Sequence, residues 1–241
     1  MANILNQEAY ERKFDKHAEE MPFDDAIKHH VGGIDNYYLV GATQRQMLEN
    51  EGLRNGQYVI DIGSGSGRLA VMLNRKMKIQ YLGVEAVSRL VDYCREELPD
   101  YRFEVADGFA IPEEDGQADW VTAFSLFTHL LHEQSYLYMQ HAMRVLKPGG
   151  KLVLSFLEYS VAAHRKLFLR TVRSSNSDRP LVVFNDRVGL NFFAEMLGFS
   201  NVVYYEGSKY IVEFSDPEKL PDGKKIKGGR AIGQSICIMT K

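Results

Sequence analysis

Residues 59–68, VIDIGSGSGR, form an apolar run that reaches an acidic residue and continues into three glycines at alternate positions. An apolar run of this length predicts a buried strand, and the glycines predict a tight turn into a helix. Such a turn is typical of nucleotide binding, although the same pattern also occurs in tight turns that bind no ligand. The stretch therefore indicates an α/β fold and leaves open which ligand, if any, the turn binds.

The rest of the chain repeats this alternation of short apolar runs and amphipathic helices. Strands separated by helices predict βαβ units and a parallel sheet. Because such sheets bind ligands at the carboxyl ends of their strands, we expect functional residues directly after each strand. The pattern predicts strands at 58–62, 80–85, 102–106, 119–124, 151–156, 201–205 and 234–239, and helices at 67–76, 88–98, 133–146 and 186–197.

Asp61, two residues before Gly63, bears on the choice of ligand. Its carboxylate would repel a pyrophosphate at this turn and would attract a ligand that carries an ammonium group. A carboxylate on the same ligand can meet the backbone N–H groups at the helix start near Gly67. S-adenosylmethionine combines an ammonium group, a carboxylate and a sulfonium, so the charge pattern favours it.

Two further acidic residues follow the next two predicted strands. Glu85 comes about 20 residues after the glycines, where a carboxylate can accept hydrogen bonds from both ribose hydroxyls. Asp107 can accept from the exocyclic amine of adenine, with Gly108 and Phe109 lining the ring. The alternatives are an exposed glutamate at a helix start and an aspartate that forms an Asx-turn.

The order of five stretches over about residues 53–157 resembles the motif set of class I S-adenosylmethionine-dependent methyltransferases: VIDIGSGSGR, YLGVEA, VADGFAIP, ADWVTAFSLFTHL and RVLKPGGKLVLSF. The resemblance implies an α/β, Rossmann-like, doubly wound seven-stranded sheet, mostly parallel with an antiparallel last strand. We expect an N-terminal helical cap segment over 1–52 and one methyltransferase domain over 53–241. The implied cofactor is S-adenosyl-L-methionine, with contacts at Asp61, Gly63, Ser64, Gly65, Glu85, Ala86, Asp107, Gly108, Phe109, Phe124, Ser125 and Leu126.

Candidate substrate contacts lie on both sides of these motifs. His129, shortly after the fourth strand, is a candidate base for a substrate proton near neutral pH, or else a structural or cofactor-contacting histidine. The stretch HHVGGIDNYYLVG, residues 29–41, offers His29, Tyr37 and Tyr38 as tentative substrate contacts. A tyrosine face can bind a methylsulfonium by a cation–π contact, but both tyrosines can equally be core aromatics.

Two segments beyond the fifth strand are expected at the same sheet edge. The basic stretch at 164–179, HRKLFLRTVRSSNSDR, offers Arg165 and Arg170 to a phosphate or carboxylate of the substrate. A solvated basic face is the alternative. The connection at 206–233 is long for a hairpin, so we expect a substrate lid or a dimer arm, with a floppy loop as the alternative.

Composition limits the function classes. The formal net charge of −3 gives no general attraction to nucleic acid. The first residues lack the apolar core of a signal peptide, and no apolar run approaches the roughly 18 residues of a membrane span. Two cysteines in no ligand or disulfide spacing favour the reducing cytoplasm and give no metal site.

Together these features predict an enzyme that methylates an oxygen or nitrogen of a small-molecule metabolite. We expect it to be cytoplasmic, to have no membrane segment and to form a homodimer. A first alternative is a non-catalytic module that only binds S-adenosylmethionine. A second is an enzyme of the same fold that performs other chemistry on S-adenosylmethionine.

Overall fold

The fold is seen in a computed structural model that describes residues 7–30, 36–173 and 181–241. Its main sheet has the strand order β3-β2-β1-β4-β5-β9-β6. All neighbouring pairs are parallel except those of β9, which runs antiparallel to β5 and to β6. This confirms the predicted sheet with its antiparallel last strand. The strands are β1 (Tyr58–Ile62), β2 (Gln80–Glu85), β3 (Arg102–Val105), β4 (Ala118–Ala123), β5 (Leu146–Phe156), β6 (Ser200–Tyr205) and β9 (Ser235–Thr240).

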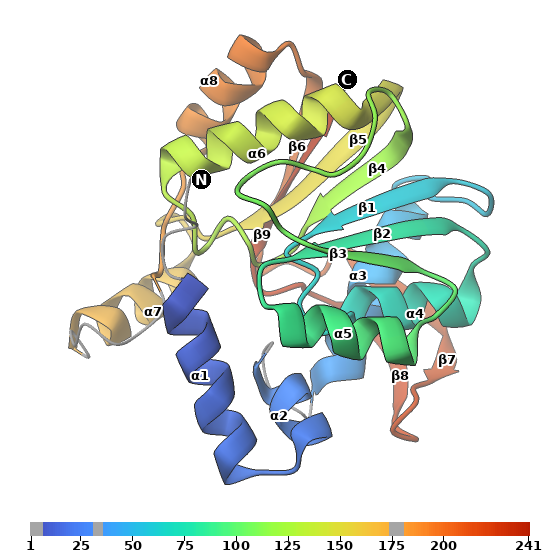
Figure 1. Ribbon diagram of the computed structural model, residues 1–241. Coiled ribbons are helices and arrows are strands. Elements are labelled where there is room, and N and C mark those ends of the chain that lie inside the picture. The colour runs from blue at the N-terminus through green and yellow to red at the C-terminus, as the bar shows by residue number, and fades with distance from the viewer. Residues whose placement is uncertain (1–6, 31–35, 174–180) are drawn as a thin grey trace.

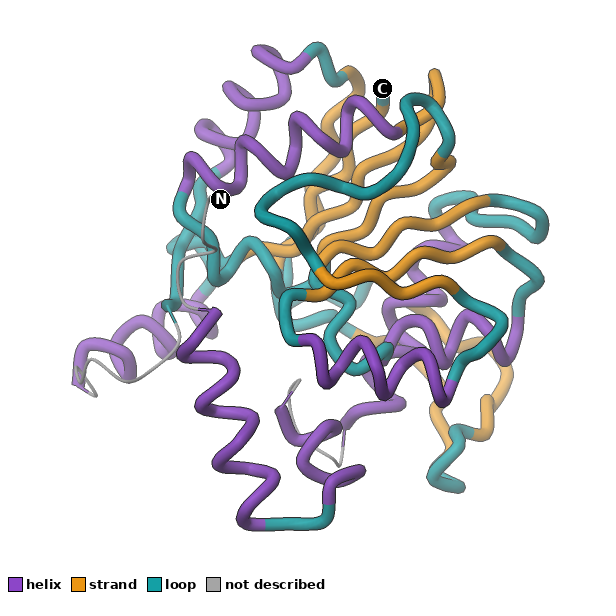
Figure 2. Tube along the Cα trace, in the orientation of Figure 1, coloured by secondary structure: helices purple, strands orange, loops and turns teal. Residues whose placement is uncertain are grey.

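Helices cover both faces of this sheet (Figures 1 and 2). In β1, Val59 packs with the helices of one face, whereas Ile60 and Ile62 pack with those of the other. Burial on both faces is why the central strands β1, β2 and β4 are mostly apolar, whereas the edge strand β3 is partly exposed and carries charged residues. One layer contains α3 (Tyr37–Asn50), α4 (Arg68–Lys76) and α5 (Ser88–Glu97), and the other contains α6 (His132–Val145) and α8 (Arg187–Leu197).

The N-terminal helices do not act as one unit. The helices α1 (Gln7–Glu20) and α2 (Phe23–His30) pack on the start of α5, where Phe14 and Ile27 contact Val87 and Leu90. An exposed ion pair between Asp15 and Arg89 joins the same elements. These two helices therefore form an appendage beside the end of β2.

The third N-terminal helix belongs to the main layer. It crosses α4 so closely that a Cβ on Gly41 would lie 2.4 Å from the backbone oxygen of Arg68. The boundary expected at residue 52 would separate α3 from the core on which it packs. The helix α3 therefore packs as part of the main layer, and the division into a cap over 1–52 and a methyltransferase domain over 53–241 stays a prediction. The helix α7 (Ala162–Arg173) lies with α1 beyond the carboxyl ends of the strands (Figure 1).

The connection at 206–233 contains an antiparallel hairpin, β7 (Val212–Lys219) and β8 (Lys225–Arg230). Its buried side chains, Val212 and Phe214 among them, join the core around α3 and α4. The hairpin packs against α3 and lies away from α1 and α7 (Figure 1). The floppy loop is therefore wrong, and the substrate lid and the dimer arm stay predictions.

A buried ion pair fastens this hairpin to α3. The Arg45 guanidinium lies 2.7 Å from a carboxylate oxygen of Glu218 and also pairs with Glu49. The Arg45 side chain is 4% exposed and that of Glu218 is 11% exposed. Water screens such a pair little, so breaking it leaves an uncompensated charge. Within the three described ranges, no helix is long and apolar enough to cross a membrane.

Candidate functional site

The loop between β1 and α4 is built by glycines in a backbone conformation that other residues rarely adopt. Gly63, Gly65 and Gly67 have φ values of 68°, 57° and 76°. A Cβ on Gly63 would lie 3.1 to 3.4 Å from side-chain atoms of Leu126. Ser64 is buried under Gly83, where a Cβ would lie 2.9 Å from its hydroxyl. The loop is thus a tightly packed turn with little room for added side chains.

Glu85, at the end of β2, lies directly against this loop, as the spacing predicts. One carboxylate oxygen accepts the backbone N–H of Gly65 at 2.9 Å, and the other accepts that of Val87 at 3.0 Å. Burial raises the pKa of Glu85, although the backbone N–H groups of Val87, Gly65 and Ala86 counteract it. Each oxygen keeps a lone pair for a ligand hydroxyl, so the group is suited to hold a ribose.

Asp61 is more enclosed than the sequence suggested. It pairs with Gly83 on β2 and with Thr122 on β4, and it is 4% exposed. Its two oxygens accept hydroxyl protons from Tyr81 and Thr122, each at 2.7 Å. Burial raises the pKa of Asp61 to about 6, against the lowering effect of these two hydroxyls. Both carboxylate oxygens of Asp61 are therefore engaged within the protein, and its contact with the cofactor stays a prediction.

The tip after β3 carries Asp107, Gly108 and Phe109, whose contact with adenine stays a prediction. Asp107 is exposed and makes no hydrogen bond within the described residues, so the Asx-turn alternative is wrong. Phe109 packs edge-on against Tyr138, with 5.3 Å between the ring centroids. The Tyr138 hydroxyl lies 3.4 Å from the backbone oxygen of Gly108. This tyrosine of α6 thus holds the tip in place.

The turn after β4 contacts both the glycine loop after β1 and the end of β5. Phe124 is buried, and Leu126 packs on Gly63. Between them Ser125 has a φ of 63°, which is uncommon for a residue that has a Cβ. Its backbone N–H donates to Ser155 Oγ at 2.6 Å, and this bond holds the conformation.

His129 follows the same turn, and its ring is oriented by the backbone. Nδ1 lies 2.6 Å from the carbonyl oxygen of Leu181, so Nδ1 carries the proton. In the neutral ring the lone pair then belongs to Nε2. The backbone N–H of Val183 donates to the Thr128 oxygen at 2.8 Å, which fixes this segment against the turn. Both readings of His129 remain predictions.

The two tyrosines of the N-terminal stretch differ. Tyr37 is 3% exposed, and its hydroxyl donates to the backbone oxygen of Ser66 at 2.7 Å. It therefore supports the glycine loop as a core aromatic, the alternative left open above, and its role as a substrate contact stays a prediction. Tyr38 is half-buried against Tyr37 and stays a prediction, as does His29 at the exposed end of α2. Residues 31–35 of this stretch lie outside the described residues.

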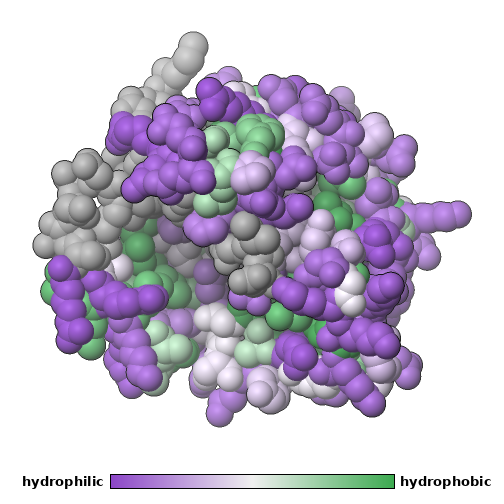
Figure 3. Space-filling model, turned by 90° about the horizontal axis from the view of Figure 1, so that it is seen from below, coloured by the Kyte–Doolittle hydropathy of each residue, from purple (hydrophilic) through white to green (hydrophobic). Residues whose placement is uncertain are grey.

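The described part of the basic stretch, residues 164–173, lies in α7, which exposes both basic and apolar side chains. Arg165 donates to the backbone oxygens of Tyr159 and Ser160 at 2.8 and 3.0 Å, so it closes the turn after β5. Arg170 is exposed. Exposed apolar side chains, including Leu169, accompany the basic ones, and Figure 3 shows both kinds on the side where α7 lies. Substrate binding by Arg165 and Arg170 stays a prediction, and residues 174–180 lie outside the described ranges.

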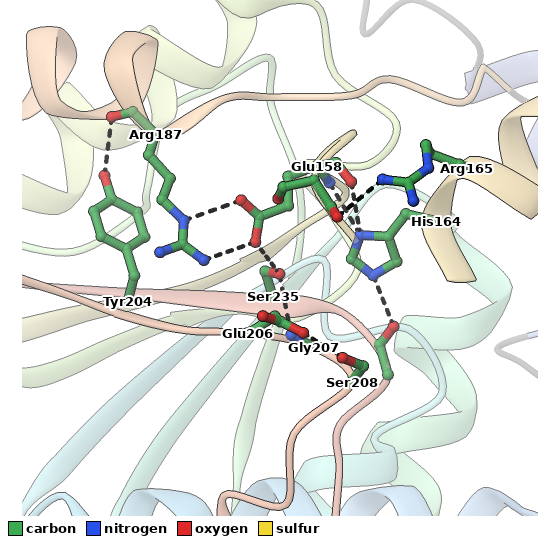
Figure 4. Close-up of polar contacts among 11 residues, drawn as sticks. Glu158, His164, Arg165, Arg187, Tyr204, Glu206, Gly207, Ser208 and Ser235 are labelled. Carbon is green, nitrogen blue, oxygen red and sulfur yellow. Dashed lines mark hydrogen bonds and ion pairs between the residues drawn. The ribbon is translucent and has the colours of Figure 1, made fainter. Parts of the chain in front are cut away.

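A polar cluster after β5 was missed from the sequence (Figure 4). Glu158 is buried and accepts two hydrogen bonds from Arg187, at 2.9 and 3.0 Å, and one from Ser235 at 2.6 Å. Burial raises the pKa of Glu158, but these bonds lower it below its ordinary value. His164 on α7 lies with Nε2 3.0 Å from the Gly233 oxygen. Looking directly after the fifth strand would have found Glu158.

Comparison with known proteins shows which family the chain resembles. Residues 59–150 match the family model of a methyltransferase domain. Over 196 residues, the chain is 26% identical to the ubiquinone/menaquinone biosynthesis C-methyltransferase UbiE of Pseudomonas putida, covering 70% of this chain and 75% of that protein. Over 142 residues it is 28% identical to an uncharacterized 37.1 kDa transposon protein of Streptomyces fradiae, covering 55% of this chain but only 40% of that protein.

The fold also matches solved structures over nearly the whole chain. Magnesium protoporphyrin IX methyltransferase of Synechocystis PCC 6803, solved with bound S-adenosylhomocysteine, aligns with a TM-score of 0.64 and 13% identity. The alignment covers 98% of this chain and 97% of that one. At this identity the likeness shows the fold.

Proposed function

Because the chain is a class I S-adenosylmethionine-dependent methyltransferase, we propose that it methylates an oxygen or nitrogen of a small-molecule metabolite. The observation that carries the proposal is the assembly of the glycine loop with Glu85 beside Asp61. It provides a backbone cradle, a ribose acceptor and a negative field in one place. These groups fit the carboxylate, the hydroxyls and the cationic groups of S-adenosylmethionine, which is the cofactor.

The order of the strands suggests which strand tip contacts each part of the cofactor and which tips contact the methyl acceptor. We assign adenine to the tip of β3 with Asp107, the ribose to the tip of β2 with Glu85, and the methionine part to the loop after β1. These strands neighbour one another in that order. The methyl acceptor then belongs beyond β1, over the tips of β4, β5 and the start of β9. The segments that meet there are those of Ser125, Glu158 and Gly233.

When bound, S-adenosylmethionine supplies an already activated methyl group, so the chain mainly has to align the acceptor. A hydroxyl acceptor also requires removal of its proton. His129 is the candidate base because the Leu181 carbonyl orients its ring and the turn after β4 places it on the acceptor side. An amine that binds in its neutral form needs less help.

The segment held beside the acceptor side supports a small molecule in this proposal. Residues 181–185 are fixed to the turn after β4 by the bond from Val183 to Thr128, and to the end of β5 by the bond from Asn185 to Leu157. The net charge of −3 gives no general attraction to a nucleic acid. The relative UbiE is named a C-methyltransferase, so a carbon acceptor is the competing outcome of the assay below.

The test is a screen for S-adenosylhomocysteine formation over hydroxylated, amino and carbon-acid metabolites, with product mass spectrometry. Methylation at oxygen or nitrogen supports the proposal, and methylation only at carbon overturns it. Incubation with S-adenosylmethionine alone detects other chemistry on the cofactor. Tight binding without any product over the whole screen would favour a binding module.

A matched pair of variants tests the cofactor site. Glu85→Gln removes the charge that the ribose hydroxyls meet, and we expect S-adenosylmethionine affinity to fall about tenfold or more by calorimetry. Glu104→Gln, on exposed β3 and paired with Arg95, should leave it unchanged. Equal affinities for the two variants would show that Glu85 does not hold the ribose.

We also propose that the protein acts in the cytoplasm. Cys94 and Cys237 are buried free thiols, which suits a reducing compartment. A homodimer stays a prediction, to be tested by light scattering of the purified protein.

A further inference from the structure

Gln234 stands at the acceptor side of the sheet edge, directly before β9. Because β9 runs antiparallel to β5, its first residues lie beside the last residues of β5, and Ser235 pairs with Phe156. The neighbouring tip is the turn after β4, with Ser125. The next residue of that turn, Leu126, packs on Gly63 of the cofactor loop. Gln234 therefore lies one turn away from the loop, on the side assigned to the acceptor.

A chain of hydrogen bonds fixes which way the Gln234 amide faces. The backbone N–H of Ser125 donates to Ser155 Oγ at 2.6 Å. Ser155 is buried, so its own proton needs an acceptor, and it donates to Gln234 Oε1 at 2.6 Å. The Ser125 hydroxyl lies 3.3 Å from the same oxygen. Turning the amide over would leave the Ser155 proton without an acceptor.

The other end of the amide is therefore a donor. Within residues 7–30, 36–173 and 181–241, Gln234 Nε2 has no hydrogen-bond partner. This nitrogen is also not fully buried, so it is accessible to a ligand. The residue is half-buried. An amide nitrogen donates and cannot accept, so it suits an oxygen lone pair and disfavours an ammonium group.

We propose that Gln234 donates a hydrogen bond from Nε2 to an oxygen of the methyl acceptor. The enzyme would thereby select acceptors with a carbonyl, carboxylate or phenolate oxygen near the methylated atom. The inference rests on the proposed function, because it takes the tips of β4, β5 and β9 as the acceptor side. It narrows the substrate class to molecules that present a hydrogen-bond-accepting oxygen.

The experiment follows the side-chain amide of Gln234 directly. The protein is labelled with ¹⁵N and saturated with S-adenosylhomocysteine, and the signal is assigned by its loss in Gln234→Met. Benzoate and neutral acetophenone serve as oxygen-bearing probes, and benzylammonium is the cationic probe. We expect both oxygen-bearing probes to shift the Gln234 signal and benzylammonium to leave it in place. A signal that none of the probes moves, or that all three move alike, overturns the proposal.

Variants separate donation to a ligand from support of the Ser125 turn. Gln234→Glu keeps an acceptor for Ser155 and Ser125 but has no N–H. We expect it to bind S-adenosylhomocysteine like the wild type and to bind acetophenone about tenfold more weakly. Gln140→Met, at an exposed position of α6, should bind both ligands unchanged.

These measurements also distinguish the inference from the proposed function. If the wild-type protein does not bind S-adenosylhomocysteine, the proposed function is contradicted. Normal S-adenosylhomocysteine binding together with unchanged acetophenone binding by Gln234→Glu would contradict the role of Gln234 alone. Acetophenone has no charge, so a weaker complex with the glutamate variant cannot be ascribed to repulsion between two anions.

Discussion

The carboxylate of Glu85 accepts a hydrogen bond from the backbone N–H of Gly65 at 2.9 Å, so the end of β2 and the loop after β1 are held together directly. The acid that is expected to hold a ribose already has its position fixed by the loop that is expected to hold the methionine part. Binding then requires little reorganisation of either segment, which favours affinity because less conformational freedom is lost on association.

The first prediction concerns the pH dependence of cofactor binding. The pKa of Asp61 is raised to about 6, and a cationic ligand favours its ionised form. S-adenosylmethionine affinity should therefore increase about tenfold between pH 5 and pH 7, as measured by calorimetry. Asp61→Asn should remove most of this increase. An equally steep pH profile in Asp61→Asn would show that another group causes it.

The same shift predicts the stability of the ligand-free protein. A carboxyl group whose pKa is higher in the folded state than in the unfolded state binds more protons when folded. The free energy of unfolding should therefore fall as pH rises from about 4 to about 6, by up to about 3 kcal/mol from Asp61. Urea unfolding of the wild type and of Asp61→Asn across this range measures it. A contribution that increases with pH would contradict the burial of this group.

A third prediction uses two glycines with nearly equal backbone angles. Gly63→Ala meets both the left-handed conformation, at φ 68°, and the side chain of Leu126. Gly116→Ala meets only the conformation, at φ 67°, with no atom within 4 Å of the new Cβ. Each should lose about 1 to 2 kcal/mol of stability for the backbone, but only Gly63→Ala should weaken cofactor binding. Similar binding by both variants would argue against the cradle.

The fourth prediction tests the support beneath the loop. Tyr37→Phe removes the donor to the buried Ser66 oxygen and should cost about 1 to 3 kcal/mol in thermal or urea unfolding. Tyr38→Phe changes the adjacent ring, whose hydroxyl makes no hydrogen bond within the described residues, and should cost little. Equal stability of the two variants would mean that Tyr37 does not fix the loop.

The last prediction concerns the hairpin. Arg45→Met leaves Glu218 without its cation and should destabilise the protein by about 3 to 5 kcal/mol, whereas Arg45→Met combined with Glu218→Leu should recover much of the loss. Arg89→Met breaks the exposed pair with Asp15 and should cost less than about 1 kcal/mol. If the double variant is no more stable than Arg45→Met, the unpaired charge is not the cause.

Local patterns in the sequence were sufficient for the sheet and the glycine loop. The central parallel strands β1, β2 and β4 are buried on both faces, so each appears as a mostly apolar run, and the acids at or directly after the strand ends were found by position. The surroundings of Asp61 depend instead on register. Tyr81 and Thr122 lie on different strands, and only the pairing of β2 and β4 with β1 brings their hydroxyls to one carboxylate.

The hairpin was missed for a different physical reason. Pro217 has no N–H to donate and argues against a strand in any sequence-based prediction. In the structure it lies where the pairing of β7 with β8 is interrupted, between Phe214 and Glu218, so no ladder bond is lost. Likewise Ser155 lies one residue before the end of β5, between apolar neighbours, and the role of its hydroxyl is visible only from its contact with Gln234.

The place of β9 in the sheet has a consequence for biosynthesis. This strand follows all the others in sequence but lies between β5 and β6, so those two cannot be joined until it has left the ribosome. The strands assigned to the cofactor, β3, β2 and β1, are neighbours in the sheet and can assemble earlier. The acceptor side, with Gln234 at the start of β9, is completed last. During synthesis, the cofactor-binding strands of the nascent chain can therefore fold before the acceptor-binding side of the site exists.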